Sequence, residues 1–425
     1  MIKIQRAQEF MADSRKISAA PPEITADVAS IIADVINRGD DAVREYTLRH
    51  DGCAIDSFEV SQAAVNRAFD EIGSEFAAIL KRAAENIEEF HRHQIQQGYI
   101  VTPRDGVVLG QRVLPLNRAG VYIPGGTAVY PSSVLMNVIP AKLAGVSEII
   151  MVTPPSKDGG VNPGILAAAK VAGVDRIFTV GGAQAVAALA FGTQTIPKVD
   201  KITGPGNAYV AEAKRQVFGV VGIDMIAGPS DVLVIADKAG NPVLIAADML
   251  SQAEHGADSV AVLVTDSMPL AERVSAEIET QLAQLPREKF AREAIDNYGK
   301  IIVTDSIEEA FEISNGLAPE HLEIFLDEPL GYLNLVTNAG SVFLGKNTPE
   351  PLGDYYAGPN HTLPTSGTAR FSSPLSVDDF IKKSSFTYYT ADALAKVSAD
   401  VAAFAEKEGF SAHARSVTKR GVQNE

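Results

Sequence analysis

The segment Glu148-Ile149-Ile150-Met151-Val152 is a short run of apolar and β-branched residues that ends at a pair of prolines. An alanine-rich segment follows it, and the same alternation recurs through the middle of the chain. Strands of a parallel sheet are buried on both faces and are joined by helices, so this alternation predicts a parallel α/β sheet. The strand candidates of this first series are residues 120–123, 148–152, 176–180 and 201–203.

A second series of candidate strands follows the first and has the same character. Its members are residues 232–236, 260–264, 301–303, 322–325 and 341–344. Before both series, apolar residues recur at helical spacing in residues 28–36 and again in residues 76–95. The predicted fold class is therefore α/β, with two Rossmann-like parallel-sheet domains in tandem and a small N-terminal helical segment.

The chain after Ser376 becomes polar and is predicted to be helical, with one amphipathic helix over residues 397–409. So short a segment buries too little apolar surface for a core of its own, so it has to dock on its own chain or on a partner's. We predict this division of the chain: residues 1–20 as an N-terminal extension, 21–120 with 232–375 as the larger α/β domain, 121–231 as an inserted second α/β domain, and 376–425 as a C-terminal arm.

Composition narrows the class of protein. A chain of 425 residues suits roughly two to three domains. The net charge of -16, with dispersed acidic residues, argues against nucleic acid, which needs a basic face. The single cysteine, Cys53, excludes an internal disulfide and suits a reducing cytosol. Residues 1–5 lack a signal-peptide core, and every apolar run is interrupted before the roughly 20 residues that a membrane span needs. We therefore predict a cytoplasmic protein that binds neither nucleic acid nor a membrane.

Glycine clusters accompany the ends of several candidate strands. They are Pro124-Gly125-Gly126, Gly181-Gly182-Ala183-Gln184, Gly204-Pro205-Gly206-Asn207 and Gly228-Pro229-Ser230. Ligands of parallel sheets bind beyond the carboxyl ends of strands, and glycine lets the backbone approach a phosphate or ribose closely. The clusters are consistent with a nucleotide and also with ordinary α/β turns. The G-x-G-x-x-G fingerprint is absent, so a dinucleotide would bind without the usual pyrophosphate loop.

The stretch Ser251-Gln252-Ala253-Glu254-His255-Gly256 holds three potential metal ligands. On a helix Gln252 and His255 share a face, whereas Glu254 points elsewhere. Remote candidates complete the half-site: Asp354, in the glycine- and proline-rich loop of residues 353–365, and His413, near the C-terminus. Imidazole and carboxylate with one amide oxygen suit a borderline ion such as zinc.

A second cluster, Pro319-Glu320-His321, precedes the candidate strand at residues 322–325. Adjacent Glu320 and His321 lie at the start of a candidate strand. They are either two separate general bases or an ordinary acidic residue and histidine of a loop. His361, in the loop of residues 353–365, is a further candidate for a metal or substrate contact, because such loops often carry function. The histidines of the N-terminal helical part are expected to be exposed or packing residues: His50, His91 and His93.

Taken together, these segments resemble histidinol dehydrogenases, a family of zinc- and NAD-dependent enzymes. The resemblance rests on the following segments, which run in the family's order from about residue 120 to the C-terminus: Tyr122-Ile123-Pro124-Gly125-Gly126, Val180-Gly181-Gly182-Ala183-Gln184-Ala185, Gly204-Pro205-Gly206-Asn207-Ala208, Ala227-Gly228-Pro229-Ser230, Ser251 to Gly256, Ala318-Pro319-Glu320-His321-Leu322-Glu323, Gly353 to Thr365, and Ala412-His413.

The resemblance implies a role for each candidate residue. One zinc ion per subunit would be held by Gln252, His255, Asp354 and His413. His413 would come from the other subunit of a domain-swapped homodimer, whose C-terminal arm crosses over. Glu320 and His321 would be the acid–base pair. Ser230, His361 and Glu408 would contact the substrate beside His321 and the zinc ligands. Tyr122, Gln184 and Asn207 would line the NAD site, on the side of residues 121–231.

The implied reaction is the oxidation of L-histidinol, by way of L-histidinaldehyde, to L-histidine, the last steps of histidine biosynthesis. Three alternatives remain: a dehydrogenase of the same family acting on another polar alcohol such as a sulfonated diol, a zinc hydrolase that uses Glu320, and a metal-stabilised structural dimer. Glu408 and Pro319-Glu320-His321 are intact and favour histidinol, while Gln184 and Asn207 among the glycine loops favour a dinucleotide over hydrolysis.

Overall fold

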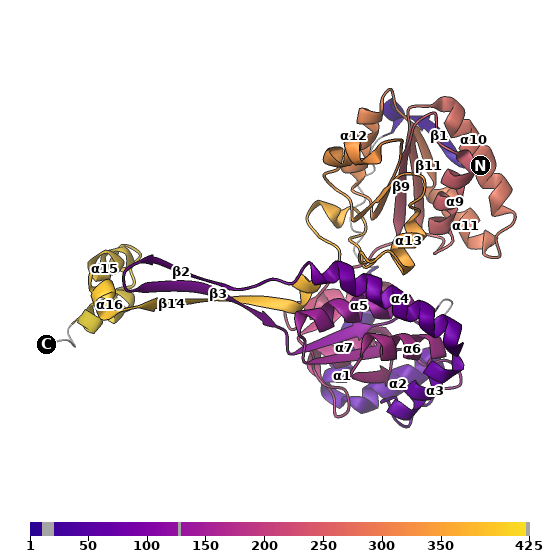
Figure 1. Cartoon of the computed structure of the whole chain (residues 1–425). Coiled ribbons are helices and arrows are strands. Elements are labelled where there is room, and N and C mark those ends of the chain that lie inside the picture. The colour runs from indigo at the N-terminus through magenta and orange to yellow at the C-terminus, as the bar shows by residue number, and fades with distance from the viewer. Residues whose placement is uncertain (11–20, 126–128, 422–425) are drawn as a thin grey trace. The chain divides into compact units, whose positions relative to one another are not determined.

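The computed structural model describes residues 1–10, 21–125 and 129–421. The chain divides into two compact units, the first made of Met1–Gln94 with Leu116–Phe380 and the second of Ile95–Pro115 with Ile381–Glu425. The first unit contains two parallel sheets flanked by helices (Figure 1).

In the described residues, the larger sheet has six parallel strands in the order β1-β11-β10-β9-β12-β13. Their bounds are β1 Lys3–Arg6, β9 Asp231–Ala236, β10 Val260–Thr265, β11 Lys300–Val303, β12 His321–Phe325 and β13 Ser341–Leu344. The helices that follow in this part are α9 Pro242–Ala253, α10 Met268–Leu282, α11 Glu288–Tyr298, α12 Ile307–Leu317 and α13 Glu350–Tyr355. Both faces of the sheet are buried: Val232 and Val234 pack in one apolar cluster, Leu233 and Ile235 in another.

The smaller sheet has five parallel strands within the described ranges, in the order β6-β5-β4-β7-β8. Their bounds are β4 Arg118–Tyr122, β5 Glu148–Thr153, β6 Arg176–Thr179, β7 Lys201–Thr203 and β8 Gly222–Ile223. The helices between and after them are α5 Pro131–Ala144, α6 Pro163–Ala172, α7 Gly182–Phe191 and α8 Ala208–Val217. Both predicted strand series are thus confirmed, as is the α/β class. Ile149 and Met151 face one apolar cluster and Ile150 and Val152 the other, because successive side chains of a strand alternate between its faces.

The N-terminal helices belong with the smaller sheet. They are α1 Pro22–Arg38, α2 Asp40–Asp51, α3 Gln62–Glu71 and α4 Gly73–Arg92, and they pack on α5 to α8. We predicted that residues 21–120 would join residues 232–375. The packing instead places α1 to α4 with residues 118–223, and residues 95–115 belong to the second unit. An apolar stripe indicates that a helix packs, but not on which sheet. The predicted extension at residues 1–20 also differs, because Lys3–Arg6 pairs with β11 as an edge strand; residues 11–20 lie outside the described ranges.

The second unit contains strands that the sequence analysis did not predict. β14 Ile381–Tyr389 pairs antiparallel with β3 Val107–Pro115, which pairs with β2 Tyr99–Arg104. The expectation that the chain is helical from Ser376 was therefore wrong for residues 381–389. Most side chains of β14 are exposed on both faces, so it lacks the apolar alternation that marks a half-buried strand. The helices of this unit are α14 Ala391–Ala395, α15 Ser398–Lys407 and α16 Ser411–Gly421, and α15 confirms the amphipathic helix expected at residues 397–409.

Short 3-10 helices complete the elements: η1 Ala7–Glu9, η2 Pro329–Leu335, η3 Thr368–Arg370 and η4 Val377–Phe380. Across the described ranges, no helix combines the length and apolar character that a membrane crossing requires.

Candidate active site

A pocket of about 570 Å³ in the first unit gathers most of the predicted residues. Its volume falls in the range typical of small-ligand sites. The predicted residues that line it are Asn207, Ser230, His255, Glu320, His321, Asp354 and His361, together with Gly125, Gly204, Gly206 and Gly228. The glycines of the smaller sheet follow β4 and β7, as the carboxyl-end rule predicts. In the larger sheet, Ser230 and Glu320 lie instead just before β9 and β12, at the amino ends of those strands.

His321, the first residue of β12, is held in one tautomer. Its Nδ1 lies 2.9 Å from the backbone carbonyl oxygen of Asp231. A carbonyl oxygen only accepts, so Nδ1 carries the proton and donates it. Nε2 then presents a lone pair, and it has no hydrogen-bond partner among the described residues. Burial lowers the pKa of His321 to about 4, so the ring is neutral near pH 7. The imidazole is thus prepared to accept a proton at Nε2.

Glu320 is tied to Asp231 by two reciprocal hydrogen bonds. The Asp231 N–H donates to Glu320 Oε2 at 3.0 Å, and the Glu320 N–H donates to Asp231 Oδ1 at 2.9 Å. Burial raises the pKa of Glu320 well above its usual value, and the nearby Asp231 charge adds to the effect. Ala318, two residues before Glu320, has φ 51, a left-handed conformation that costs roughly 1–2 kcal/mol for a residue with a Cβ. Such strain is typical of functional sites.

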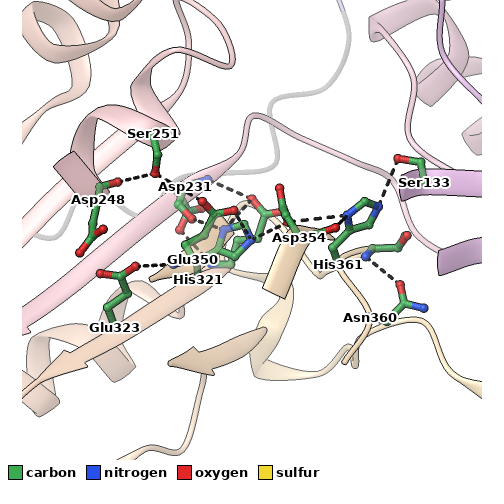
Figure 2. Close-up of polar contacts among 12 residues, drawn as sticks. Ser133, Asp231, Asp248, Ser251, His321, Glu323, Glu350, Asp354, Asn360 and His361 are labelled. Carbon is green, nitrogen blue, oxygen red and sulfur yellow. Dashed lines mark hydrogen bonds and ion pairs between the residues drawn. The ribbon is translucent and has the colours of Figure 1, made fainter. Parts of the chain in front are cut away.

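A group of carboxylates surrounds the free Nε2 of His321 (Figure 2). Glu350 Oε1 lies 3.7 Å and Asp354 Oδ1 4.0 Å from this nitrogen. His321, Glu350 and Asp354 each offer one possible metal-ligand atom, and these atoms lie within 4.8 Å of one another. Burial, with the charge of Asp354, raises the pKa of Glu350 to about 9. The site thus concentrates negative charge that favours a cation or a proton.

Gln252 and His255 occupy the end of α9 and the turn after it. Gln252 is fully buried, and neither its Oε1 nor its Nε2 has a hydrogen-bond partner in the described part of the chain. Orphaned buried amide atoms are costly and point to a group that is bound in function. His255 lines the pocket with Asp354. Three of the four predicted zinc ligands therefore belong to the first unit.

The loop of residues 353–365 is fastened to α5 and α4. His361 Nδ1 donates to the carbonyl oxygen of Asp354 at 3.0 Å, so its Nε2 accepts from Ser133 Oγ at 3.2 Å. Asn360 donates to the carbonyl oxygen of Met136 at 2.6 Å. Its Nδ2 also lies 3.4 Å from Nε2 of His91, a fully buried residue of α4. These bonds fix the loop that carries Asp354 and His361.

The buried His91 is expected to make the stability of the protein depend on pH. Its Nδ1 lies 2.7 Å from Gln94 Oε1, and burial lowers its pKa below the usual 6.5. The unfolded chain therefore takes up a proton at a higher pH than the folded chain, so stability is lost as pH falls below 6.5. We expect His91→Gln to lose less unfolding free energy than the wild type between pH 7.5 and 5.5, measured by urea unfolding. His93→Gln, an exposed site on the same α4 segment, should behave as the wild type. An equal loss in His91→Gln and the wild type would contradict this role for His91.

The loop after β7 is anchored by a buried ion pair. Lys214 and Asp224 form a salt bridge with side chains only 2% and 1% exposed. Lys214 Nζ donates to the carbonyl oxygen of Gly204 at 3.0 Å, and Asp224 Oδ2 accepts from the Gly204 N–H at 2.7 Å. Gly204 has φ 110, and a Cβ there would collide with the carbonyl oxygen of Tyr122. Asn207, the next polar residue, caps α8 and lines the pocket.

Tyr122 and Gln184 lie deeper in the smaller sheet layer. The Tyr122 hydroxyl accepts from the Gly182 N–H at 3.0 Å, and burial raises its pKa to about 12. Gln184 is 1% exposed, and its Nε2 lacks a hydrogen-bond partner among the residues described. Tyr122 therefore supports the glycine turn at residues 181–182, and Gln184 retains an unused donor.

Glu408 and His413 lie in the second unit, at the end of α15 and on α16, and both are exposed. His413 stacks on Phe410 with ring centroids 5.0 Å apart. The sequence analysis missed three buried residues that contact the predicted ones: Ser133, Asp231 and Glu350. Asp231 carries a readable signal, because it follows Ser230 directly. Ser133 and Glu350 give none, because only folding brings them beside His361 and His321.

Comparisons with known proteins show the family of the chain. The family model described as Histidinol dehydrogenase matches residues 14–421. The chain is 56% identical to a histidinol dehydrogenase of Clostridium acetobutylicum, covering 94% of this chain and 92% of that protein. It is 52% identical to one of Geobacillus kaustophilus, covering 99% of each. The crystal structure of histidinol dehydrogenase from Elizabethkingia anophelis matches with a TM-score of 0.93 at 40% identity, covering 99% of this chain and 98% of that one. The chain therefore belongs to the histidinol dehydrogenase family.

Proposed function

We propose that this oxidoreductase converts L-histidinol to L-histidine through L-histidinaldehyde in two NAD-dependent oxidations, with one zinc ion per subunit. The observation that carries the proposal is the fixed tautomer of His321: its unpartnered Nε2 lies 3.7 Å from Glu350 and 4.0 Å from Asp354, in a pocket that glycine loops and Glu320 also line. Family membership and the names of its relatives support L-histidinol as the substrate.

The residues fit a zinc ion. Gln252 holds a buried amide without partners, His255 offers an imidazole, and Asp354 offers a carboxylate among buried polar groups. This nitrogen and oxygen set suits zinc. We propose Gln252, His255 and Asp354 as ligands, with His413 of a second copy as the fourth. When bound, zinc would hold and orient the substrate, a role that does not require redox chemistry.

The residues also fit NAD, which accepts the hydride in each oxidation. The loop at Gly204 and Asn207 lines the pocket, where close backbone approach is possible. Gln184 holds a buried amide nitrogen that a ligand would satisfy. We propose Asn207, Gln184 and Tyr122 as the NAD side of the pocket, with Tyr122 acting through the turn at Gly182.

The chain's own groups divide the proton transfers. His321 Nε2 accepts the hydroxyl proton of the alcohol in the first oxidation. Glu320 then removes a proton from a water molecule that adds to the aldehyde, and the hydrated aldehyde is oxidised in the second step. Because the pKa of Glu320 is raised, its ionised carboxylate accepts a proton more strongly than that of an ordinary glutamate. Ser230 and His361 line the pocket and would contact the substrate, with Glu408 from the second copy.

The stoichiometry of NADH formation tests the proposed function. L-histidinol, limiting in the presence of excess NAD and the purified protein, should yield two NADH per molecule, followed by absorbance. A sulfonated diol should give much slower NADH formation. Product formation without NADH would overturn the proposal in favour of a hydrolase. Absence of any turnover by a zinc-loaded protein would overturn it in favour of the third alternative, a metal-stabilised structural dimer.

Lys214→Met tests the NAD side of the pocket. It leaves Asp224 as an uncompensated buried charge, so we expect unfolding free energy to fall by about 3–5 kcal/mol. The Gly204 loop also loses an anchor, so KM for NAD should rise more than KM for histidinol. Lys142→Met, which removes an exposed pair with Asp175, should cost about 0–1 kcal/mol and leave both KM values unchanged. Equal increases in the two KM values would contradict a specific role in the NAD site.

We further propose that the chain functions as a homodimer in which the C-terminal arm completes the partner's site. The second unit supports this proposal because its buried cluster consists of three alanines, Ala402, Ala405 and Ala414. Large apolar side chains remain exposed in it, among them Tyr388, Phe404 and Phe410. So small a core needs cover from another surface.

Mixing two inactive variants tests the shared site. His255→Ala and His413→Ala chains, unfolded together and refolded, should recover part of the activity, because one site of each heterodimer holds both intact histidines. The same variants refolded separately are the control. No recovery in a verified heterodimer would contradict a shared site.

A cytoplasmic location stays a prediction.

A further inference from the structure

Asp231 forms hydrogen bonds with both proposed proton acceptors, Glu320 and His321. It is the first residue of β9, which lies next to β12, and it is 8% exposed. Its backbone N–H and its carboxylate each make a hydrogen bond to Glu320, and its backbone carbonyl oxygen accepts one from His321. It does not appear among the residues that line the pocket.

We propose that Asp231 is a positioning residue that holds Glu320 for the aldehyde step and His321 for the alcohol step. The inference rests on the proposed function, because it assigns those two steps to Glu320 and His321. Asp231 acts through these residues and does not itself touch the substrate.

The three hydrogen bonds divide cleanly between main chain and side chain. The Asp231 carbonyl oxygen fixes the His321 tautomer, and its N–H orients Glu320 Oε2. Both contacts belong to the backbone and survive a change of side chain. The carboxylate makes the third bond, from Oδ1 to the Glu320 N–H at 2.9 Å. A side-chain substitution therefore removes the support of Glu320 and retains the direct hydrogen bond to His321.

This division predicts an unequal effect on the two oxidations. Without its acceptor, the buried Glu320 N–H loses a hydrogen bond, and the backbone that carries Glu320 is free to shift. A buried group left without its partner typically costs 1–3 kcal/mol, which corresponds to about 5- to 160-fold in rate if it is lost at the transition state. Asp231→Ala should thus lower kcat for L-histidinaldehyde by about fivefold or more. It should lower kcat for the alcohol step by about threefold or less and leave KM for histidinol unchanged.

The experiment measures the two half-reactions of the zinc-loaded protein separately, with L-histidinol and with L-histidinaldehyde. Asp231→Asn retains an oxygen acceptor and should restore the aldehyde rate to within about twofold of wild type. In a Glu320→Gln background, Asp231→Ala should slow the aldehyde step much less than in the wild type, because the residue it supports no longer acts as a base. Asp200→Ala is a matched control in the smaller sheet: its carboxylate accepts from the backbone N–H groups of Asn117 and Arg118. That variant should leave the ratio of the two rates unchanged.

A folded Asp231→Ala variant with wild-type rates in both steps, or with equal losses in both, would overturn the proposal. If Asp231→Ala does not fold, Asp231→Leu keeps a similar shape without the acceptor and should show the same unequal loss. Failure of both variants to fold would assign Asp231 to folding alone and also overturn it. A wild-type protein that forms no NADH from histidinol would instead refute the proposed function, so the two failures are distinguishable.

Discussion

Glu320→Gln is expected to slow the oxidation of L-histidinaldehyde by about 10²–10⁴-fold, the usual contribution of a general base. The oxidation of L-histidinol to the aldehyde should slow far less, because His321 performs that proton transfer. Glutamine keeps an oxygen that accepts from the Asp231 N–H, so the fold should survive. The measurement is presteady-state NADH formation from L-histidinol, which reports the first oxidation, set against the rate of NADH formation from L-histidinaldehyde, with circular dichroism as a check of folding.

A matched control for Glu320→Gln is Glu212→Gln, a buried glutamate of α8 that pairs with Arg215 and does not line the pocket. It should leave the ratio of the two rates unchanged. Equal losses in both oxidations by Glu320→Gln would contradict the assignment of Glu320 to the water.

His321→Asn should have the opposite pattern, with the alcohol oxidation slowed by about 10²–10⁴-fold. The asparagine amide can still donate to the carbonyl oxygen of Asp231 in place of Nδ1, but it has no counterpart of the lone pair on Nε2. Presteady-state NADH formation from histidinol, set against the rate from histidinaldehyde, measures the effect. His50→Asn, at an exposed position of α2, is the control and should have no effect. A first oxidation of unchanged rate would show that another group takes the proton.

Burial acts in opposite directions on the two residues that these variants remove. It disfavours charge on both, so it raises the pKa of Glu320 and lowers that of His321. A carboxylate and an imidazole whose pKa values are driven in opposite directions are typical of enzymes that divide proton transfers between two groups. The hydrogen bond from His321 Nδ1 to the carbonyl oxygen of Asp231 fixes the tautomer of His321, which burial alone does not determine.

The strands of the two parallel sheets other than β1 and β8 were predictable because most of their residues are buried, whereas these two short edge strands are partly exposed and were not predicted. A buried strand such as Glu148–Thr153 requires a continuous apolar run, and that requirement is local. The strand Ile381–Tyr389 has no such requirement, since most of its side chains are exposed, and its partner β3 lies more than 260 residues earlier in the chain. Its antiparallel pairing was therefore beyond any local pattern.

The candidate site divides in the same way. Pairs of residues that are close along the chain could be predicted from the sequence, because neighbouring residues keep a fixed geometry along a helix or strand. These pairs are Gln252 with His255 and Glu320 with His321. The glycine- and proline-rich loop of residues 353–365 marked Asp354 and His361 as candidates, and the resemblance to a known family added the roles of the residues. The sequence did not indicate that Glu350 faces His321 or that Ser133 binds His361, because those pairs are distant along the chain and meet only through packing.

The sequence by itself determined the α/β class, the strands of the two parallel sheets other than β1 and β8, and part of the polar residues of the candidate site, because apolar periodicity and residue chemistry are local properties. The tertiary structure alone decided which sheet the N-terminal helices cover, since an apolar stripe fits either layer. It also decided which nitrogen of His321 is free, because that depends on the carbonyl oxygen of Asp231, a residue 90 positions away that the pairing of β9 with β12 brings within 2.9 Å.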